Sequence, residues 1–268
     1  MSPDARPTVE AVPLAGGESV SFTARSPARE TANEDAWGIA PLGERTAVLA
    51  VADGVGGERG GARASRLAVA TVLEAVAEDG TPEHRSLRAA ILDGIERANV
   101  AVLATGGATT LAVVEIDNGE ARAYHVGDSL ILHVGQRARV KYRALAHGPV
   151  GYGVEAGLIG HDEALHHDDL HVVSNVVGSA DMRIEIGPRR RLDPRDTVLL
   201  ATDGLSDNLY PEEIIETVRR GPAVRCARRL EQLAARRMAA PDRDGPHKPD
   251  DLTFVMFRPV RSGRQARG

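Results

Sequence analysis

Cysteine, lysine and aromatic residues are all scarce in this chain of 268 residues. The single cysteine, Cys226, excludes an internal disulfide framework and is typical of proteins from a reducing compartment. Because only 3% of the residues are aromatic, the hydrophobic core must be filled by Val, Leu, Ile and Ala. Lysine occurs only at Lys141 and Lys248, so nearly all of the positive charge comes from arginine.

Long apolar runs and an excess of positive charge are also missing, which excludes several classes of protein. No apolar run approaches the roughly 20 residues that span a bilayer. Residues 1–17 include Asp4, Arg6 and Glu10 and do not have the continuous apolar segment of a secretory signal. The formal net charge of −5 provides no basic surface for nucleic acid or anionic lipid. We therefore expect a soluble, cytoplasmic protein that binds neither nucleic acid nor membrane.

Composition divides the chain into a central domain and two short ends. Residues 1–17 are rich in Pro, Ala and Gly without periodicity and predict a flexible N-terminal arm, and residues 261–268 predict a basic, flexible tail. Residues 18–260 contain no linker or internal repeat, so we expect one domain there. Within this domain, residues 145–180 form a polar, histidine-rich insertion.

The spacing of apolar residues alternates between strand and helix periods along this domain. Strands are predicted at 19–26, 35–43, 46–53, 109–145 (a meander), 182–187, 196–204 and 252–260, and helices at about 62–77, 82–104 and, as a pair, 211–240. The second helix should begin after Thr81-Pro82, and Asp117-Asn118-Gly119 should form a tight turn. Runs of strands with helices in separate pairs indicate an α+β layered fold.

Carboxylates flank the predicted core strands at four places. Asp53 and Asp203 each follow an apolar run and precede a glycine, and the pairs Glu34-Asp35 and Asp250-Asp251 each precede a strand. Any one of them could form a turn or cap a helix, as Asp commonly does. Several buried carboxylates together, however, require a cation or a set of hydrogen-bond donors. Oxygen ligands with few useful His or Cys partners favour a hard ion, Mg²⁺ or Mn²⁺.

Six short motifs follow one another in the order NEDAWG, VADGVGGERGGARAS, GATTL, HVGDS, ATDGLSDN and PDDLTF. In this order they resemble the PPM-type, or type 2C, metal-dependent serine/threonine protein phosphatases in their bacterial form, over about residues 20–258. Each motif alone is weak, whereas five or six in family order are specific. The resemblance implies a four-layer α-β-β-α sandwich of two antiparallel sheets flanked by paired helices, with a binuclear metal centre at one end.

The resemblance also implies the ligands of two Mn²⁺ or Mg²⁺ ions. Asp53 would bridge both ions. Glu34 and the carbonyl group of Gly54 would serve one ion, and Asp203 and Asp250 would serve the other.

Other acids of these motifs receive roles from the same resemblance. Asp250 rather than Asp251 should be the ligand, because the first residue of the family's acidic pair takes that role. Asp35 resembles the acid that orients metal-bound water. Asp128 matches a position that, with Asp203, holds a third, weaker ion in many bacterial members.

Such a centre implies hydrolysis of phosphoserine and phosphothreonine in proteins by a metal-activated water. Two ions about 3.5–4 Å apart activate the water near neutral pH and neutralise charge on the phosphoryl oxygens. The expected partners are phosphorylated proteins, the substrates of a serine/threonine kinase. Gly56 and Gly57 should leave room for the phosphoryl group, and the insertion 145–180 stands where the family has a flap that positions protein substrates.

The match departs from the family pattern at three positions, Glu30, Val55 and Leu130; the last stands where the family often reads Gly-Asp-Ser-Arg, which affects a surface contact and not catalysis. Family members usually carry a phosphate-binding arginine four residues before the glutamate, where this chain has Glu30. A one-residue insertion in the loop would deliver Arg29 to the phosphate; otherwise Arg29, like Arg25, is a solvated surface residue. Val55 stands where many eukaryotic relatives have a histidine that is proposed as the general acid, so the source of the leaving-group proton stays open.

Two other kinds of catalytic site can be read from the sequence. His167 and His171, four residues apart, imitate the spacing of a zinc-binding helix, but no third ligand is evident. Ser129 lies in a Gly-Asp-Ser-Leu stretch, so a serine esterase of the GDSL type would use it as nucleophile with His247 and Asp244. That family places its serine near the N-terminus, whereas Ser129 is in the middle of the chain.

Two further alternatives keep the phosphatase fold. A pseudophosphatase would bind phosphoproteins without turning them over, and the displaced arginine is the feature that favours it. A phosphatase of a stress switch, acting on anti-sigma-factor antagonists, would share the metal chemistry, but nothing in the chain marks a sensor domain. We therefore expect a stand-alone phosphatase that opposes a serine/threonine kinase.

Overall fold

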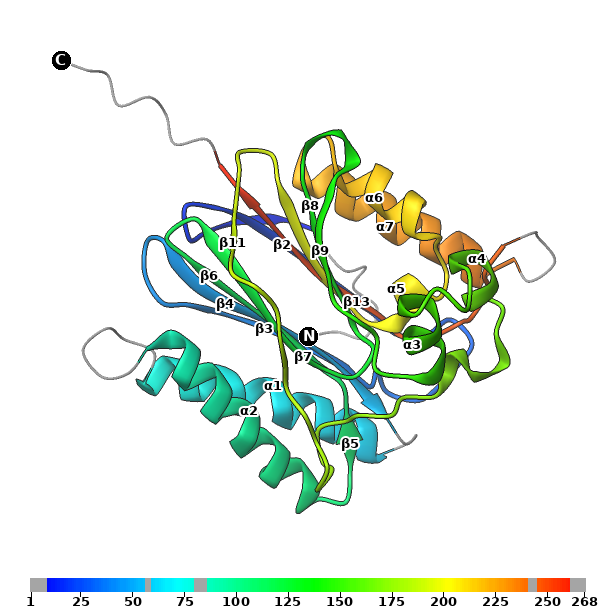
Figure 1. The fold of residues 1–268 in the computed structure, drawn as a ribbon, viewed down its shortest axis with the longest axis horizontal. Coiled ribbons are helices and arrows are strands. Elements are labelled where there is room, and N and C mark those ends of the chain that lie inside the picture. The colour runs from blue at the N-terminus through cyan, green and yellow to red at the C-terminus, as the bar shows by residue number, and fades with distance from the viewer. Residues whose placement is uncertain (1–8, 56–58, 80–85, 241–244, 261–268) are drawn as a thin grey trace.

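Two antiparallel sheets lie face to face in the computed structural model, and a pair of helices covers the outer face of each sheet (Figure 1). The structure describes residues 9–55, 59–79, 86–240 and 245–260. The predicted α+β sandwich of four layers, α-β-β-α, is therefore confirmed. This arrangement matters for function because strands from both sheets end at the same edge of the sandwich, where the acidic motifs meet.

The first sheet has six strands in the order β1-β2-β13-β12-β8-β9. These strands are β1 (Ala11–Leu14), β2 (Gly17–Ala24), β8 (Leu130–Val134), β9 (Val140–Arg143), β12 (Thr197–Ala201) and β13 (Leu252–Pro259). β12 and β13 are buried almost throughout, as the continuous apolar sequence of central strands predicts. The two strands run antiparallel, so the residues just after β12 meet those just before β13.

The second sheet has the order β10-β7-β6-β4-β3, with β5 paired to β4 and β11 to β7. Its strands are β3 (Asp35–Pro41), β4 (Thr46–Val55), β5 (Ala108–Thr109), β6 (Leu111–Asp117), β7 (Glu120–Val126), β10 (Glu185–Ile186) and β11 (Arg190–Arg191). In the register of β3 and β4, Asp35 lies opposite Asp53. The predicted turn between β6 and β7 is present: Asn118 and Gly119 both have positive φ, of 50° and 81°, as a two-residue hairpin turn requires.

Each helix pair packs on its sheet through small and branched apolar side chains. α1 (Arg59–Asp79) and α2 (Leu87–Leu103) cover the second sheet, and α6 (Pro211–Val218) and α7 (Ala223–Met238) cover the first. A third cluster, which includes Leu49, Leu200 and Phe257, fills the space between the sheets. Among the described helices, none has the length and hydropathy that crossing a membrane would require.

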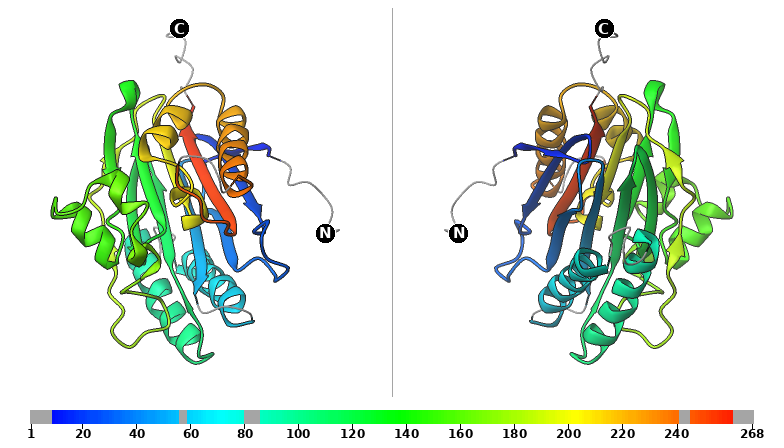
Figure 2. Two further views of the ribbon diagram at one scale, coloured as in Figure 1. Left: turned by 90° about the vertical axis from the view of Figure 1, so that its right-hand side faces the viewer. Right: turned by 90° about the vertical axis from the view of Figure 1, so that its left-hand side faces the viewer.

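The insertion 145–180 is folded into short helices rather than strands. It contains α3 (Pro149–Glu155), α4 (His161–Ala164) and the 3₁₀ helix η2 (Asp168–His171). Another 3₁₀ helix, η1 (Gln136–Ala138), connects β8 to β9. α3 and α4 lie beside α5 (Asp203–Ser206) at one end of the sandwich (Figure 1) and project at the margin of the molecule (Figure 2).

Two predicted segments differ from the structure. The flexible arm expected over 1–17 is wrong for its second half, because β1 pairs with β2 and the side chains of Val9 and Leu14 are buried. Helix α2 begins at Leu87, where the Ser86 hydroxyl caps it by accepting from Ala89 N–H. The predicted cap Thr81-Pro82 and the predicted tail 261–268 lie outside the described residues.

A buried ion pair fastens β8 to β9 at the end of the first sheet away from the acidic motifs. Asp196 is fully buried, and its Oδ2 accepts hydrogen bonds from His133 Nε2 (2.8 Å), Lys141 Nζ (2.6 Å) and the Asp193 amide (2.8 Å). Burial opposes ionisation, but the donors from His133 and Lys141 outweigh it and lower the pKa of Asp196. The carboxylate therefore stabilises the fold at neutral pH.

Replacing Asp196 by Ala is expected to lower the free energy of unfolding by about 3–5 kcal/mol at pH 7, the usual effect of leaving one buried partner uncompensated. Because the pKa of Asp196 is lower in the folded state, its contribution is complete above its ordinary value near 4 and disappears as the pH falls through the folded value. Urea unfolding at pH 7 and at pH 3 checks this. Asp193→Ala, which removes a half-exposed partner of Lys141, is the control and should change stability by less than about 1 kcal/mol. An equal loss of unfolding free energy in both variants would contradict the role of Asp196 as the stabilising carboxylate.

Candidate metal centre

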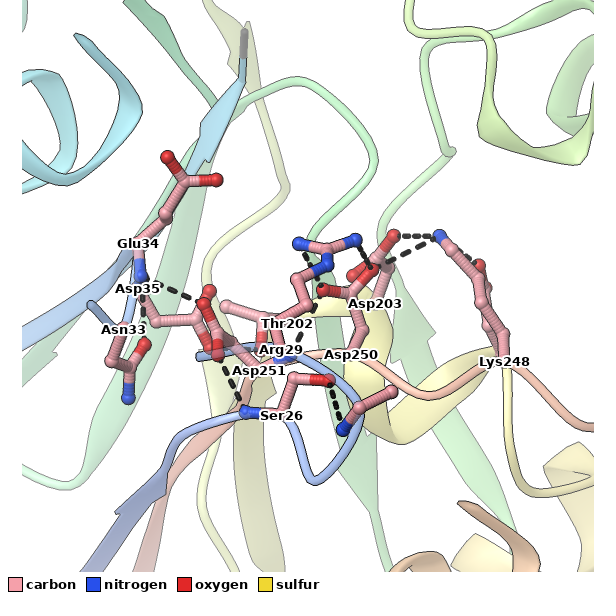
Figure 3. Close-up of polar contacts among 12 residues, drawn as sticks. Ser26, Arg29, Asn33, Glu34, Asp35, Thr202, Asp203, Lys248, Asp250 and Asp251 are labelled. Atoms are coloured by element: carbon pink, nitrogen blue, oxygen red, sulfur yellow. Dashed lines mark hydrogen bonds and ion pairs between the residues drawn. The ribbon is translucent and has the colours of Figure 1, made fainter. Parts of the chain in front are cut away.

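Carboxylates from both sheets converge at one edge of the sandwich (Figure 3). Glu34 and Asp35 stand at the start of β3, and Asp53 lies near the end of β4. Asp203 is the first residue of α5, which follows β12 after one connecting residue. Asp250 lies just before the first residue of β13, separated from it by Asp251. The structure therefore brings together all the acids that the sequence predicted as ligands of the two ions.

Three hydrogen bonds hold the backbone of Glu34, and none of them uses its carboxyl group. Its amide donates to Asp251 Oδ2 (2.7 Å), and its carbonyl oxygen accepts from the Ser65 hydroxyl (2.5 Å) and from the Gly54 amide (3.2 Å). The side-chain atom Oε1 is buried and has no hydrogen-bond partner in the described part of the chain. Burial, followed by the charge of Asp251, raises the pKa of this carboxyl group.

Asp53 is fixed by its backbone to the loop that leads into β6. Its amide donates to Thr110 Oγ1 (2.9 Å), and its carbonyl oxygen accepts from the Thr110 amide (2.8 Å) and the Thr109 hydroxyl (2.7 Å). Burial raises the pKa of Asp53 well above its usual range, and the neighbouring charges of Asp203 and Asp35 add to the effect. A carboxyl group in such surroundings ionises readily only when a cation is present.

Gly54 allows β4 to approach the start of α1. A Cβ atom at this position would lie 2.3 Å from the carbonyl carbon of Gly61, far inside contact distance. No side chain fits there, so the close approach of Gly61 requires a glycine after Asp53. Gly56 and Gly57, which were expected to leave room for a phosphoryl group, lie outside the described residues.

Asp35 joins the two sheets below the cluster. Its Oδ2 accepts a hydrogen bond from the Thr202 hydroxyl (2.8 Å), which in turn accepts from the Thr253 amide (3.1 Å). Burial raises the pKa of Asp35 well above its usual range even though these donors oppose the shift. Thr202 could not be selected from the sequence, because its partner Asp35 lies 167 residues away along the chain.

The two adjacent acids before β13 have different surroundings, as Figure 3 shows. Asp251 is buried and accepts from two backbone amides, those of Ser26 and Glu34, both at 2.7 Å. Asp250 instead faces the cluster, where Arg29 approaches its Oδ1 at 3.1 Å. Both carboxylate oxygens of Asp251 are thus occupied by backbone donors, whereas Asp250 faces the cluster; Asp250 as the ligand stays a prediction.

Arg29 reaches the cluster, whereas Arg25 does not. The guanidinium group of Arg29 lies against Asp250, and the Arg29 side chain remains 45% exposed. Arg25 donates to the carbonyl oxygen of Glu30 within its own loop. The loop therefore places Arg29, one residue earlier in the sequence than the family position at Glu30, beside the carboxylates.

Asp207 and Lys248 belong to the cluster but were not selected from the sequence. The Lys248 ammonium donates to Asp203 and to Asp207 Oδ2 (2.9 Å). Burial raises the pKa of Asp207 to about 8, with the Asp203 charge as the next cause. Although burial opposes ionisation of Asp203, the adjacent Lys248 lowers its pKa. One signal was available: Asp207 follows Asp203 by four residues, one helical turn, and so shares its face.

Asp128 lies in the loop between β7 and β8, where its carboxyl group interacts electrostatically with that of Asp203. Burial raises the pKa of Asp128 to about 7, and the charge of Asp203 adds to this shift. The next residue, Ser129, is buried, and its hydroxyl shares a hydrogen bond of 2.7 Å with Thr110. His247, the proposed base of an esterase, is bonded instead to the carbonyl oxygen of Met238. The GDSL interpretation therefore fails on geometry; its third member, Asp244, lies outside the described residues.

The structure gives no support to a zinc site in the insertion. His167 and His171 flank and end the short 3₁₀ helix η2, where a four-residue spacing does not place side chains on one face, and His167 accepts from the Asp169 amide. Another group, His125, His147 and Glu185, has ligand atoms within 4.8 Å of one another. However, His147 Nδ1 accepts from the Gly127 amide, so a neutral ring carries its proton on Nε2 and offers no lone pair to a metal there.

The cluster fits hard divalent cations. Among the residues that the structure describes, two cationic side chains, those of Arg29 and Lys248, face eight carboxyl groups in this cluster: Glu34, Asp35, Asp53, Asp128, Asp203, Asp207, Asp250 and Asp251. Glu34 Oε1 and Asp203 Oδ1 are both buried without a hydrogen-bond partner among the described residues. Unpaired carboxylate oxygens of this kind are strongly unfavourable without a cation, and an all-oxygen set is what Mg²⁺ or Mn²⁺ prefers.

An apolar pocket of about 220 Å³ opens beside the acids. Asp128, Asp203 and Asp207 line it on one side. The remaining lining comes mainly from β8, β9, the insertion and α6, and includes Leu132, Val150, Leu165 and Ile214. The insertion therefore forms one wall of a pocket that is continuous with the candidate metal centre.

The chain is similar in sequence to known bacterial protein phosphatases. PhpP, a protein phosphatase of Streptococcus pneumoniae, is 31% identical over 187 residues, which are 65% of this chain and 73% of that protein. PstP, a serine/threonine protein phosphatase of Mycobacterium tuberculosis, is 28% identical over 200 residues, 70% of this chain but 37% of that longer protein.

Solved structures extend the likeness to most of the fold. The M. tuberculosis phosphatase PstP/Ppp superposes with a TM-score of 0.74 at 25% identity, covering 90% of this chain and 98% of that one. The Streptococcus agalactiae serine/threonine phosphatase gives a TM-score of 0.77 at 24% identity, with 90% and 99% covered. The catalytic domain of PstP was solved in complex with two manganese ions and is 25% identical, with a TM-score of 0.72 and with 90% of this chain and 97% of that one covered. A family model described as Protein phosphatase 2C matches residues 25–240, and the chain therefore belongs to the protein phosphatase 2C family.

Proposed function

We propose that this chain is a metal-dependent phosphatase that hydrolyses phosphoserine and phosphothreonine in proteins. The observation that carries the proposal is the set of carboxylates at the sandwich edge, with buried oxygens of Glu34 and Asp203 that lack partners. Membership of the protein phosphatase 2C family supports the same reading. The proposed partners are proteins phosphorylated by a serine/threonine kinase.

Two Mn²⁺ or Mg²⁺ ions are proposed as the cofactors, as in the PstP catalytic domain that was solved with two manganese ions. Asp53 would contact both ions, with Glu34 and the Gly54 carbonyl group on one side and Asp203 and Asp250 on the other. When bound, such ions supply Lewis-acid activation of a water and neutralise charge on a phosphoryl group. The backbone contacts of Asp53 and Glu34 hold these ligands in place before any ion arrives.

The remaining residues would orient the reactants. Asp35 has a raised pKa and is anchored through Thr202, which suits its carboxyl group to orient the attacking water and take up its proton. Arg29, whose side chain lies beside Asp250 and is partly exposed, would bind two phosphoryl oxygens through its planar guanidinium group. The apolar pocket would accept side chains next to the phosphorylated residue, so substrate selection would depend on the insertion.

Hydrolysis by chelator-stripped protein tests the proposal. p-Nitrophenyl phosphate and a phosphothreonine peptide should be cleaved when Mn²⁺ is added and not when it is removed again. Arg29→Ala should raise KM for the peptide and lower kcat/KM about 10–100-fold, which corresponds to the loss of a charge-assisted contact of about 1.5–3 kcal/mol. Failure to cleave either compound with Mn²⁺ or Mg²⁺ would reject the phosphatase and favour a protein that binds phosphoproteins without turnover.

A further inference from the structure

Lys248 places a permanent positive charge inside the candidate metal centre. Its ammonium group donates to Asp203 and to Asp207 Oδ2 at 2.9 Å, and it lies 3.8 Å from Asp250 Oδ2 (Figure 3 shows the contact with Asp203). The charge of Lys248 also acts on Asp128, where it opposes the rise in pKa that burial and Asp203 cause. The ammonium thus stands among the acids rather than at their rim.

The backbone of Lys248 is fixed so that the side chain must enter this cluster. The buried side chain of Asn208 accepts from the Lys248 amide (2.9 Å) and donates to its carbonyl oxygen (2.8 Å). The same Asn208 amide nitrogen also donates to Gly204 O (2.9 Å), one residue after Asp203. Lys248 is therefore clamped on both sides to the segment that carries Asp203 and Asp207, unlike a lysine that reaches in from a free loop.

The ammonium group contacts Asp203, one of the two acids that were expected to hold a third ion. Asp128 and Asp203 are that expected pair, and the structure adds Asp207 to them. An ammonium group is a compact charge with three N–H donors, so it can satisfy carboxylates on several sides. Being tethered, it is present at every metal concentration, and a divalent ion could enter only by displacing it.

We infer that Lys248 supplies the positive charge of a third metal ion, so that this chain binds two divalent ions and excludes the third. This inference rests on the proposed function, since the two remaining sites are those proposed for the phosphatase. It assigns Lys248 and Asp207 to the control of metal stoichiometry, with Asn208 as the residue that positions Lys248.

Metal binding, measured separately from turnover, tests the inference. Equilibrium dialysis of chelator-stripped protein, at free Mn²⁺ that saturates the wild type, should give two bound ions per chain. Lys248→Met should bind one additional Mn²⁺, because the vacated carboxylates become available. The double variant Lys248→Met, Asp207→Asn should return to two ions, which locates the additional ion at Asp207.

Matched variants separate loss of this ammonium from loss of any lysine. Lys248→Arg keeps the charge and should bind two ions. Lys141→Met removes the only other lysine of the chain, whose partners are Asp193 and Asp196, and should also bind two ions. Circular dichroism before dialysis selects folded protein, and Lys248→Gln replaces Lys248→Met if the latter does not fold.

The outcomes for the two proposals are distinguishable. An unchanged count in Lys248→Met, or three ions in the wild type, overturns the inference even if the wild type is an active phosphatase. One additional ion in Lys248→Met supports the inference, and if the wild type then shows no phosphatase activity, only the proposed reaction is rejected.

Discussion

Replacing Asp53 by Asn should reduce Mn²⁺-dependent phosphatase activity by at least about 10³-fold, because a ligand to both ions contributes several kcal/mol and each 1.4 kcal/mol is a factor of ten. The substitution keeps the size of the side chain, and the backbone contacts of Asp53 with Thr109 and Thr110 do not depend on its carboxyl group. The loss should therefore come from missing metal charge and not from a displaced strand. Steady-state rates at saturating Mn²⁺ measure it.

The same variant should be more stable than the wild type when both are free of metal. Burial and the charges of Asp203 and Asp35 raise the pKa of Asp53, so the folded protein holds this proton more tightly than the unfolded chain does. A group with a raised folded pKa favours folding below its ordinary value near 4 and loses that contribution as the pH rises through the folded value. At pH 7 the carboxyl group is ionised in the unfolded chain, so its burial in the metal-free cluster opposes folding, and Asn removes this cost.

Asp203→Asn provides the matched contrast. It should abolish turnover as well, but it removes the negative charge that pairs with the Lys248 ammonium, so the metal-free protein should lose stability instead of gaining it. Thermal melting in chelator and in Mn²⁺ distinguishes the two, because Mn²⁺ should raise the melting temperature of the wild type and have little effect on either variant. Melting temperatures that move in the same direction for both variants would contradict the assigned charges.

Replacing Asp251 by Ala should destabilise the protein and impair activity without removing a ligand. Its carboxylate accepts from the amides of Ser26 and Glu34, and it is buried. Two buried N–H groups would be left without an acceptor, at about 1.5–3 kcal/mol for each bond to a charged group. Because these two amides bracket the loop that carries Arg29, the loop should lose its register over the centre, and KM should rise together with the fall in stability.

Asp250→Asn, one residue away, is the control for Asp251→Ala. Asp250 faces the cluster, and burial followed by the charge of Asp203 raises its pKa, so its ionised carboxyl group does not favour folding in the absence of metal. We expect Asp250→Asn to weaken Mn²⁺ binding, whereas the metal-free protein should resist urea at least as well as the wild type. If Asp250→Asn unfolds more easily and Asp251→Ala keeps its stability, the roles of the two acids are reversed.

Local sequence was sufficient for most of the fold. The continuous apolar runs predicted β4, β12 and β13, and helical spacing predicted α1 and the pair α6 and α7, because each of these elements has a full face in the core. The hairpin turn at Asn118 and Gly119 followed from residue types that tolerate positive φ. The errors fell where local composition is weak evidence: the proline- and glycine-rich start includes β1, which is a strand only because β2 offers it an edge.

The sequence by itself determined which acids stand at strand ends, and the order of the motifs determined the family. It did not determine what those acids contact, because the partners lie far away along the chain: Asp251 with Glu34, Thr202 with Asp35, and Lys248 with Asp203. Only the packing of one sheet on the other decided that Asp250 faces the centre, that Asp251 supports a loop, and that a lysine enters the acidic cluster. The physical reason is that the charge state of a buried carboxylate depends on its neighbours in space, and strand periodicity carries no information about them.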